Sequence, residues 1–142
     1  LIVVGKKTSY YLSVLKYIKK HNLKYIRFLE DVPADDLPSI YQASKGFIYP
    51  SSYEGFGIPV IEALNSGIPV VTTRGGCLEE TVGEGGLLVN PDDTGEMIHA
   101  IGQIVEDSAL RDRLIRQGKE HVLKFREENI IPIIYKLYLD CL

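Results

Sequence analysis

Residues 51–64 have the sequence SSYEGFGIPVIEAL, and this stretch decides the fold that we expect. The residues just before it, 47–50, are mostly aromatic or branched, which predicts a buried strand. In its second half, apolar side chains recur at helical spacing until Gly67 and Pro69, which end the helix. The predicted order is therefore a strand, a loop with glycines, and a helix.

The loop between this strand and this helix is suited to hold an anion. Gly55 and Gly57 allow a ligand to approach the backbone closely, and the first N–H groups of a helix lack partners within the helix. Pro59 favours a helix start here, because proline is tolerated in the first turn. Glu54 and Glu62 would then flank the anion. Carboxylates on both sides suit a ligand with hydroxyl groups at both ends and phosphates between them, which is the form of a nucleotide sugar.

The rest of the chain alternates between expected strands and expected helices. Further strands are predicted at residues 1–4, 25–29, 70–72 and 87–89. Further helices are predicted at residues 8–21, 35–41, 78–82, 94–105, 110–122 and 130–142. This alternation predicts an α/β fold with a Rossmann-like parallel sheet that helices cover on both faces. Such sheets bind ligands beyond the carboxyl ends of their strands, which is where the loop would lie.

Length and composition are those of one ordinary globular domain. The chain has 142 residues, of which 45% are hydrophobic and 25% are charged, so it can bury a sizeable core. No apolar run reaches the roughly 18–20 residues that span a bilayer. Cys77 and Cys141 lie far apart in the sequence, which predicts free thiols in a reducing cytoplasm.

Charge is distributed unevenly along the chain. Residues 1–27 contain seven Lys or Arg and no acidic residue, whereas residues 28–112 contain fifteen acidic residues and three basic ones. The basic start has two interpretations: a solvated helix face, or a surface attracted to an anionic membrane or a phosphorylated acceptor. The basic and aromatic pattern of a nucleic-acid binder is not present, so we expect no nucleic-acid partner.

Metal ligands and general bases are not indicated by the sequence. His21, His99 and His121 are scattered, without a partner at useful spacing. Asp92 and Asp93 precede a predicted helix, where a carboxylate caps N–H groups without a metal ion. We therefore expect no metal site and no cofactor.

Glu54 and Glu62 lie within the segments EGFGIP and EAL, which carry a resemblance to a known family. The flanking residues 49–51 (YPS) and 66–71 (SGIPVV), and the later residues 85–93 (GGLLVNPDD), agree with it. Together these segments resemble the signature of retaining glycosyltransferases of family GT4, also called glycosyl transferases group 1, which have the GT-B fold. The resemblance covers nearly the whole chain and is densest from residue 50 to residue 69.

The resemblance implies a role for each residue of the loop. Glu54 would contact hydroxyl groups of the donor sugar near the reacting carbon, so it is the catalytic candidate, as a positioning group and not as a base. Glu62 would bind the ribose hydroxyl groups of the nucleotide. The backbone N–H groups that would bind the diphosphate and the sugar belong to Gly55, Phe56, Gly57 and Ile58.

The resemblance also implies a site for the nucleobase. Residues 28–32 match a family segment whose backbone holds the base, and we assign this contact to Asp31 and Val32. The family usually has a glycine where this chain has Glu30, which is a departure from the pattern.

A glycine pair at residues 75–76 is followed by Glu79 and Glu80. In the family one glutamate follows such a pair, and the spacing to the next glycine pair selects Glu80, which we expect mainly to fix the loop. Arg74 is the basic residue nearest to the glycine loops in the sequence. We expect it to be a surface arginine; the alternative is that it neutralises a phosphate.

The resemblance implies that residues 1–142 are the nucleotide-sugar donor-binding domain of a two-domain enzyme. An N-terminal acceptor domain would be missing, and so would the first strand and helix of this domain, which carry an Arg and a Lys for the diphosphate. The whole enzyme would transfer a sugar from a UDP- or GDP-sugar to a glycan or glycolipid, with retention, in polysaccharide biosynthesis. We expect it in the cytoplasm or at the inner face of the membrane. The fragment alone would bind the donor weakly and be inactive.

The closing helix at residues 130–142 has apolar side chains on more than one face, so it should need a partner surface. The resemblance implies that this surface belongs to the first domain, and self-association is the alternative.

Two other functions remain open at this point. A sugar-nucleotide epimerase with the GT-B fold would bind the same kind of ligand, although it would need acid–base groups that the sequence does not show. A non-enzymatic Rossmann-like module, such as a receiver, would need a phosphorylatable Asp at a strand end, where this chain has a glutamate and glycines.

Overall fold

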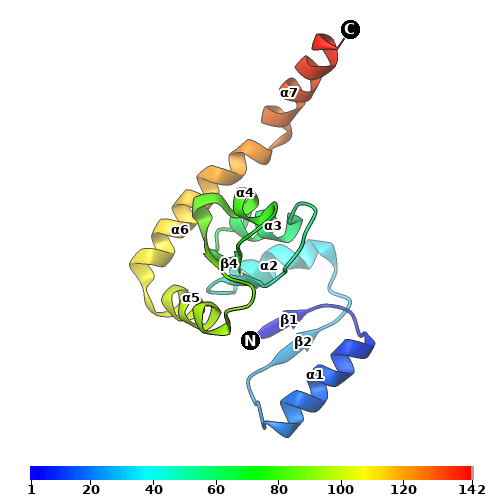
Figure 1. The fold of residues 1–142 in the computed structure, drawn as a ribbon, viewed down its shortest axis with the longest axis vertical. Coiled ribbons are helices and arrows are strands. Elements are labelled where there is room, and N and C mark those ends of the chain that lie inside the picture. The colour runs from blue at the N-terminus through cyan, green and yellow to red at the C-terminus, as the bar shows by residue number, and fades with distance from the viewer. Residues whose placement is uncertain (142) are drawn as a thin grey trace. The chain divides into compact units, whose positions relative to one another are not determined.

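The computed structural model describes residues 1–141, which form two compact units. The first unit is Leu1–Leu37, and the second is the part of the chain from Pro38 onward. Each unit contains parallel strands and helices (Figure 1). The predicted α/β class with parallel strands is therefore confirmed, and the strands form two separate sheets of two and three strands.

The first unit is a β-α-β arrangement. Its elements are β1 (Ile2–Val4), α1 (Ser9–Lys20), β2 (Arg27–Leu29) and the short 3-10 helix η1 (Ala34–Asp36). β1 and β2 pair in parallel. The Thr8 hydroxyl accepts a hydrogen bond from the N–H of Tyr11 at 3.3 Å, so the predicted cap of the first helix is confirmed. The Tyr11 ring packs edge-on against Phe28 of β2, with centroids 4.9 Å apart, which holds α1 on the strands.

The second unit has a parallel sheet in the order β3-β4-β5. Its strands are β3 (Phe47–Tyr49), β4 (Val70–Thr73) and β5 (Gly86–Val89). Its helices are α2 (Leu37–Gln42), α3 (Ile58–Asn65), α4 (Leu78–Val82), α5 (Thr94–Glu106), α6 (Ser108–His121) and α7 (Glu127–Asp140), with the 3-10 helices η2 (Gly83–Gly85) and η3 (Val122–Phe125). Each predicted strand is present, and the boundaries differ by one or two residues.

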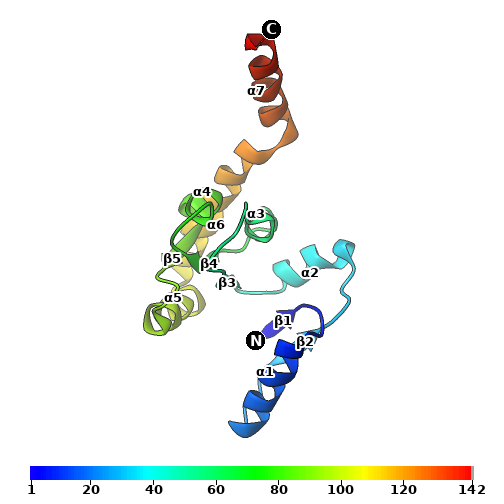
Figure 2. The ribbon, with the colours of Figure 1, turned by 45° about the vertical axis from the view of Figure 1, so that its right-hand side comes forward.

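Helices cover both faces of this sheet, as the alternation of strands and helices predicts. Val70 and Val71 of β4 are both 0% exposed, and they belong to different apolar clusters because successive side chains of a strand point to opposite faces. The Val70 cluster joins the sheet to α3 and α4. The Val71 cluster joins it to α5 and α6. Figure 2 shows α3 and α4 on one side of the sheet and α5 on the other.

A close contact between two glycines lets α6 pack against η2. A Cβ atom added at Gly85 would lie 2.6 Å from the Cα of Gly118, and one added at Gly118 would lie 2.8 Å from Cδ2 of Leu64. Leu64 itself is 1% exposed. Only glycines therefore allow α6, η2 and α3 to approach this closely.

α7 is the least buried helix of the second unit. It contacts η3 and extends away from the sheet of its unit (Figure 1). None of its described residues is buried, and Ile133 and Leu137 are 62% and 60% exposed. Leu142, the last residue of the predicted closing helix, lies outside the described residues. Within residues 1–141, no helix is long and apolar enough to cross a membrane. The predicted partner surface and self-association of this helix stay predictions.

The glycine contact of α6 can be tested with two alanine substitutions. We expect Gly118→Ala to lower the free energy of unfolding by about 1–3 kcal/mol, because the new methyl group overpacks the space next to Leu64. The matched control is Gly102→Ala in α5, where an added Cβ meets no atom within 4 Å. This control should raise stability by roughly 0.5–1 kcal/mol through helix propensity. Urea unfolding of both variants measures the difference, and equal effects would contradict the packing described for α6.

Candidate functional site

Residues 50–57 form the loop between β3 and α3, at the carboxyl end of β3. The loop is held by hydroxyl groups of β4, the neighbouring strand. The hydroxyl of Thr72 donates to the carbonyl of Tyr49 at 2.8 Å, and the hydroxyl of Thr73 donates to the carbonyl of Ser51. Both threonines are fully or almost fully buried, so the start of the loop is fixed to the sheet.

The tip of the loop is held from the side of α4. The Cys77 thiol donates to the carbonyl of Glu54 at 3.1 Å, and the Thr81 hydroxyl lies 2.5 Å from the carbonyl of Phe56. In a planar trans peptide, the C=O of one residue and the N–H of the next point in opposite directions. The N–H groups of Gly55 and Gly57 therefore point away from α4.

The N–H groups at the tip are free of backbone partners. Within the described residues, no backbone carbonyl accepts a hydrogen bond from the N–H groups of residues 55–58. α3 has no side-chain cap, and proline is among its first two residues, as the sequence predicts. Unpaired N–H groups at the start of a helix favour an anion, because the helix dipole is positive there.

The structure needs glycine at position 57 of the loop, but not at position 55. Gly57 has φ 94°, and an added Cβ would lie 2.8 Å from Cδ2 of Leu78, so the backbone conformation and the packing both need glycine. At Gly55 an added Cβ would meet no atom within 4 Å. Within residues 1–141 no atom excludes a side chain there, so the backbone at Gly55 is open to the approach of a ligand.

Glu54 is oriented by a tyrosine. The phenol of Tyr49 donates to Oε1 of Glu54 at 2.7 Å. This hydrogen bond lowers the pKa of the Glu54 carboxyl below its usual value, with a smaller effect in the same direction from Ser51. The same bond, together with partial desolvation, raises the pKa of Tyr49 to about 12. At neutral pH the pair is therefore a phenol that donates to a carboxylate.

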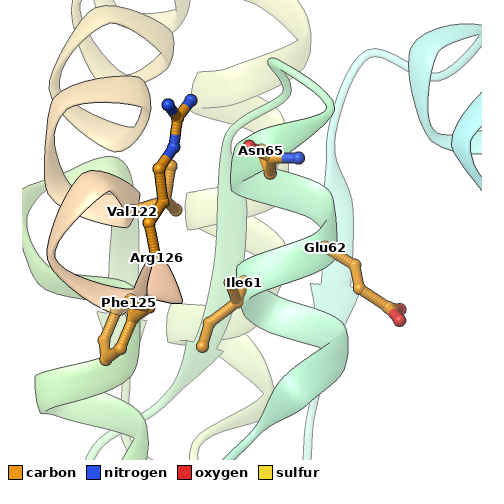
Figure 3. A pocket seen from close by; sticks show the side chains of 6 residues that line it. All are labelled: Ile61, Glu62, Asn65, Val122, Phe125 and Arg126. Atoms are coloured by element: carbon orange, nitrogen blue, oxygen red, sulfur yellow. The ribbon is translucent and has the colours of Figure 1, made fainter. Parts of the chain in front are cut away.

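Glu62 has a similar partner. It is exposed on α3, and its Oε2 accepts a hydrogen bond from the phenol of Tyr41 at 3.3 Å. Partial burial, followed by the nearby Glu62 charge, raises the pKa of Tyr41 to about 12. A shallow surface pocket is lined by Ile61, Glu62, Asn65, Val122, Phe125 and Arg126. The Glu62 carboxylate extends to the opposite side of α3 from Phe125 (Figure 3).

Phe56 connects the loop to the helix that follows α6. Its ring is 45% exposed and meets the ring of Phe125 in η3 edge-on, with centroids 5.6 Å apart. The ammonium group of Lys124 lies 4.8 Å from the centroid of the Phe125 ring. The side chain of Phe56 therefore has a packing role, and its N–H group remains the part suited to a ligand.

Asp31 and Val32, the residues assigned to the nucleobase, belong to the first unit. Asp31 has φ 50°, in the left-handed region that favours glycine, and Val32 is half-buried. Glu30, where the family has glycine, binds Lys7 at 2.7 Å and accepts from the Tyr11 phenol at 3.5 Å. The departure at Glu30 therefore has a structural role within the first unit.

The assignment of the loop-fixing glutamate to Glu80 was wrong, because Glu79 has that role. Oε1 of Glu79 accepts a hydrogen bond from the N–H of Gly75 at 2.8 Å, whereas Glu80 uses its backbone carbonyl to bind His121 at 2.9 Å. The first turn of α4 turns Glu79 back toward the glycine pair. Counting from the later glycine pair therefore selected the wrong residue.

Arg74 is an exposed residue, as predicted. Its guanidinium forms an ion pair with Glu96 of α5 at 2.8 Å, so it already has a carboxylate partner within the chain. Among residues 1–141 there is no group of three His, Cys, Asp or Glu that could hold a metal ion. Both cysteines are free thiols; Cys77 is half-buried and Cys141 is exposed.

Sequence reasoning did not identify the groups that orient the loop and its carboxylates. These groups are the phenols of Tyr41 and Tyr49 and the side chains of Thr72, Thr73, Cys77 and Thr81. One signal was available for the strand residues. Two consecutive threonines at the end of a buried strand must satisfy their hydroxyl groups, and the nearest carbonyls belong to the loop after the neighbouring strand.

Comparison with known proteins identifies the family. Residues 1–121 match the family model of glycosyl transferases group 1, and the chain belongs to this family. It is 40% identical over 105 residues to the O-antigen chain mannosyltransferase B of Escherichia coli, and this match covers 74% of the chain and 28% of that protein. The chain therefore spans less than a third of the length of this relative.

Solved structures of glycosyltransferases have the same fold. Sucrose-phosphate synthase from Thermosynechococcus elongatus superposes with a TM-score of 0.88 and is 30% identical, covering 99% of this chain and 38% of that one. HepE from Anabaena, solved in complex with UDP and glucose, has a TM-score of 0.85 and is 23% identical, covering 99% of this chain and 40% of that one. The chain thus has the fold of one part of these GT-B glycosyltransferases. These matches do not favour the epimerase or the non-enzymatic module.

The different requirements at the two glycines give a testable prediction. Gly57→Ala should lower the free energy of unfolding by about 1–3 kcal/mol, because it combines a left-handed backbone with a contact to Leu78. Gly55→Ala is the matched control and should change stability by less than about 0.5 kcal/mol. Thermal or urea unfolding distinguishes them. A Gly57→Ala variant as stable as the parent would contradict the loop conformation.

Proposed function

We propose that the chain is the C-terminal donor-binding domain of a retaining glycosyltransferase of family GT4. The whole protein would transfer a sugar from a UDP- or GDP-sugar to a glycan or glycolipid acceptor. One observation carries the proposal: among the described residues, no backbone carbonyl pairs with the N–H groups of residues 55–58 at the start of α3, and Glu54 and Glu62 belong to this loop and this helix. The complex of HepE with UDP and glucose supports the same class of ligand.

The diphosphate would bind at the tip of the loop. The N–H groups of Gly55 and Gly57 point away from α4, and the start of α3 adds the positive end of a helix dipole. During transfer the bond between the sugar and the diphosphate breaks, and negative charge develops on the diphosphate as it leaves. Donors fixed in advance around that charge lower the barrier, because they need no reorganisation. In this proposal the loop supplies the stabilisation without a metal ion.

Glu54 would hold the sugar and Glu62 the ribose. Oε1 of Glu54 already accepts from Tyr49, so its second oxygen remains to accept from a sugar hydroxyl. A carboxylate with a lowered pKa is a weak base, which suits positioning of the sugar better than removal of a proton. Asp31 and Val32 of the first unit would offer backbone groups to the nucleobase. The resemblance supports this last assignment.

The proposal also includes the acceptor and the subcellular location of the whole protein. The likeness to an O-antigen chain mannosyltransferase supports a surface polysaccharide as acceptor. Free thiols and the basic residues 1–27 support a cytoplasmic place near the inner face of the membrane.

The proposal predicts which carboxylate matters for binding. We expect calorimetry to detect binding of a UDP- or GDP-sugar, and Glu62→Gln to weaken it by about fivefold to hundredfold, because a hydrogen bond to a charged group is lost. Glu120→Gln, another exposed helical glutamate, is the matched control and should bind like the parent. EDTA should leave affinity unchanged. Failure of all four ligands (UDP, GDP and their sugar forms) to bind at millimolar concentration would contradict the proposal.

A further inference from the structure

Both carboxylates of the proposed donor site are held by phenols of the same unit. Tyr49 donates to Oε1 of Glu54 at 2.7 Å, and Tyr41 donates to Oε2 of Glu62 at 3.3 Å. The two glutamates lie on different elements, the loop and α3. Their tyrosines also come from different elements, β3 and α2. One phenol–carboxylate pair thus involves the loop, and the other involves the helix that follows it.

The two tyrosines belong to a single row of packed rings. The Tyr41 ring meets the Phe47 ring edge-on, with centroids 5.2 Å apart. The Phe47 ring stacks on that of Tyr49 at 5.7 Å, because residues two apart on a strand share a face. All three rings pack against the buried cluster that joins the sheet to α3 and α4. The core therefore fixes where both phenol oxygens lie.

We propose that Tyr49 and Tyr41 are positioning residues for the nucleotide sugar: Tyr49 fixes Glu54 for the sugar, and Tyr41 fixes Glu62 for the ribose. This inference rests on the proposed function of the loop. Each phenol occupies one oxygen of its glutamate and leaves the other oxygen for a ligand hydroxyl. Each phenol also restricts the rotamers of its glutamate in the free protein. The glutamate therefore loses less conformational entropy when the ligand binds.

The protonation states agree with these roles. The pKa values of both tyrosines are raised to about 12, so the phenols remain donors at neutral pH. The pKa of the Glu54 carboxyl is lowered, chiefly by Tyr49, so it remains an acceptor. Tyr41 and Cys77 are further titratable groups near Tyr49, and the Cys77 thiol donates to the Glu54 carbonyl. The Ser51 side chain adds a smaller effect in the same direction on the pKa of Glu54.

Tyr49→Phe and Tyr41→Phe test the inference, because phenylalanine keeps each ring in the row. Tyr49→Phe should weaken binding of the nucleotide sugar by about three- to tenfold and leave the affinity for the nucleoside diphosphate unchanged, since Glu54 would touch only the sugar. Tyr41→Phe should weaken binding of both ligands by a similar factor, since both contain the ribose. Tyr138→Phe, at an exposed tyrosine of α7, is the control and should bind both ligands like the parent.

A second readout separates positioning from a merely structural role. In the free chain, NMR titration of the Glu54 carboxyl should give a midpoint below 4.5, and Tyr49→Phe should move the midpoint up toward that value. In a double-mutant cycle, adding Tyr49→Phe to Glu54→Gln should cost little more affinity, because the tyrosine acts through the glutamate.

The possible failures are distinguishable. If the parent binds and Glu54→Gln and Glu62→Gln weaken binding, but the phenylalanine variants bind like the parent, the positioning role is wrong and the proposed function stands. Additive losses in the double-mutant cycle, or an unmoved Glu54 midpoint, would also overturn the role of Tyr49. If the parent binds neither ligand, the proposed function fails and the inference fails with it.

Discussion

Three buried threonine hydroxyls hold the loop between β3 and α3, and the candidate site depends on them. Thr72, Thr73 and Thr81 are each no more than 1% exposed, and each pairs with a carbonyl of residues 49–56. A buried hydroxyl without a partner is costly, so these bonds are strongly determined by the fold. Because the carbonyls of Glu54 and Phe56 face the side of α4, the N–H groups of Gly55 and Gly57 face the other way. The anion-binding character of the loop is thus a consequence of how the sheet satisfies its own polar groups.

The layers of the second unit explain why this loop can be both exposed and rigid. Strand β4 is buried on both faces, so its end gives a fixed support for the carbonyls of the neighbouring loop. α3 packs through Val60 and Leu64 into the core on one face, which fixes the start of the helix. The row of rings from Tyr41 to Tyr49 lies on the same face and reaches the two glutamates. One apolar cluster therefore supports the loop, the helix and both carboxylates.

The sequence was sufficient for the order of elements and for the position of the loop. Hydrophobic spacing, the Thr8 cap and Pro59 are local signals, and the corresponding strands and helices are present. Contacts between distant residues were not predictable in the same way. Tyr41 and Glu62 are 21 residues apart, and their pairing depends on where the fold places α2 and α3. The wrong choice of Glu80 over Glu79 also concerns a contact that depends on the folded structure. Neighbouring residues of a helix point about 100° apart, so only one of the two can face the glycine pair. Long-range hydrogen bonds need the packed structure.

The most direct test of the account is an amide NMR spectrum of the chain recorded with increasing UDP or GDP. The central claim is that backbone N–H groups at the tip of the loop bind a nucleoside diphosphate. The account predicts that the amide resonances of Gly55, Phe56, Gly57 and Ile58 shift most within the second unit, and that they saturate together. Largest shifts elsewhere in that unit, for instance beside Arg74 or in the pocket next to Phe125, would contradict it, and so would an unchanged spectrum at millimolar nucleotide.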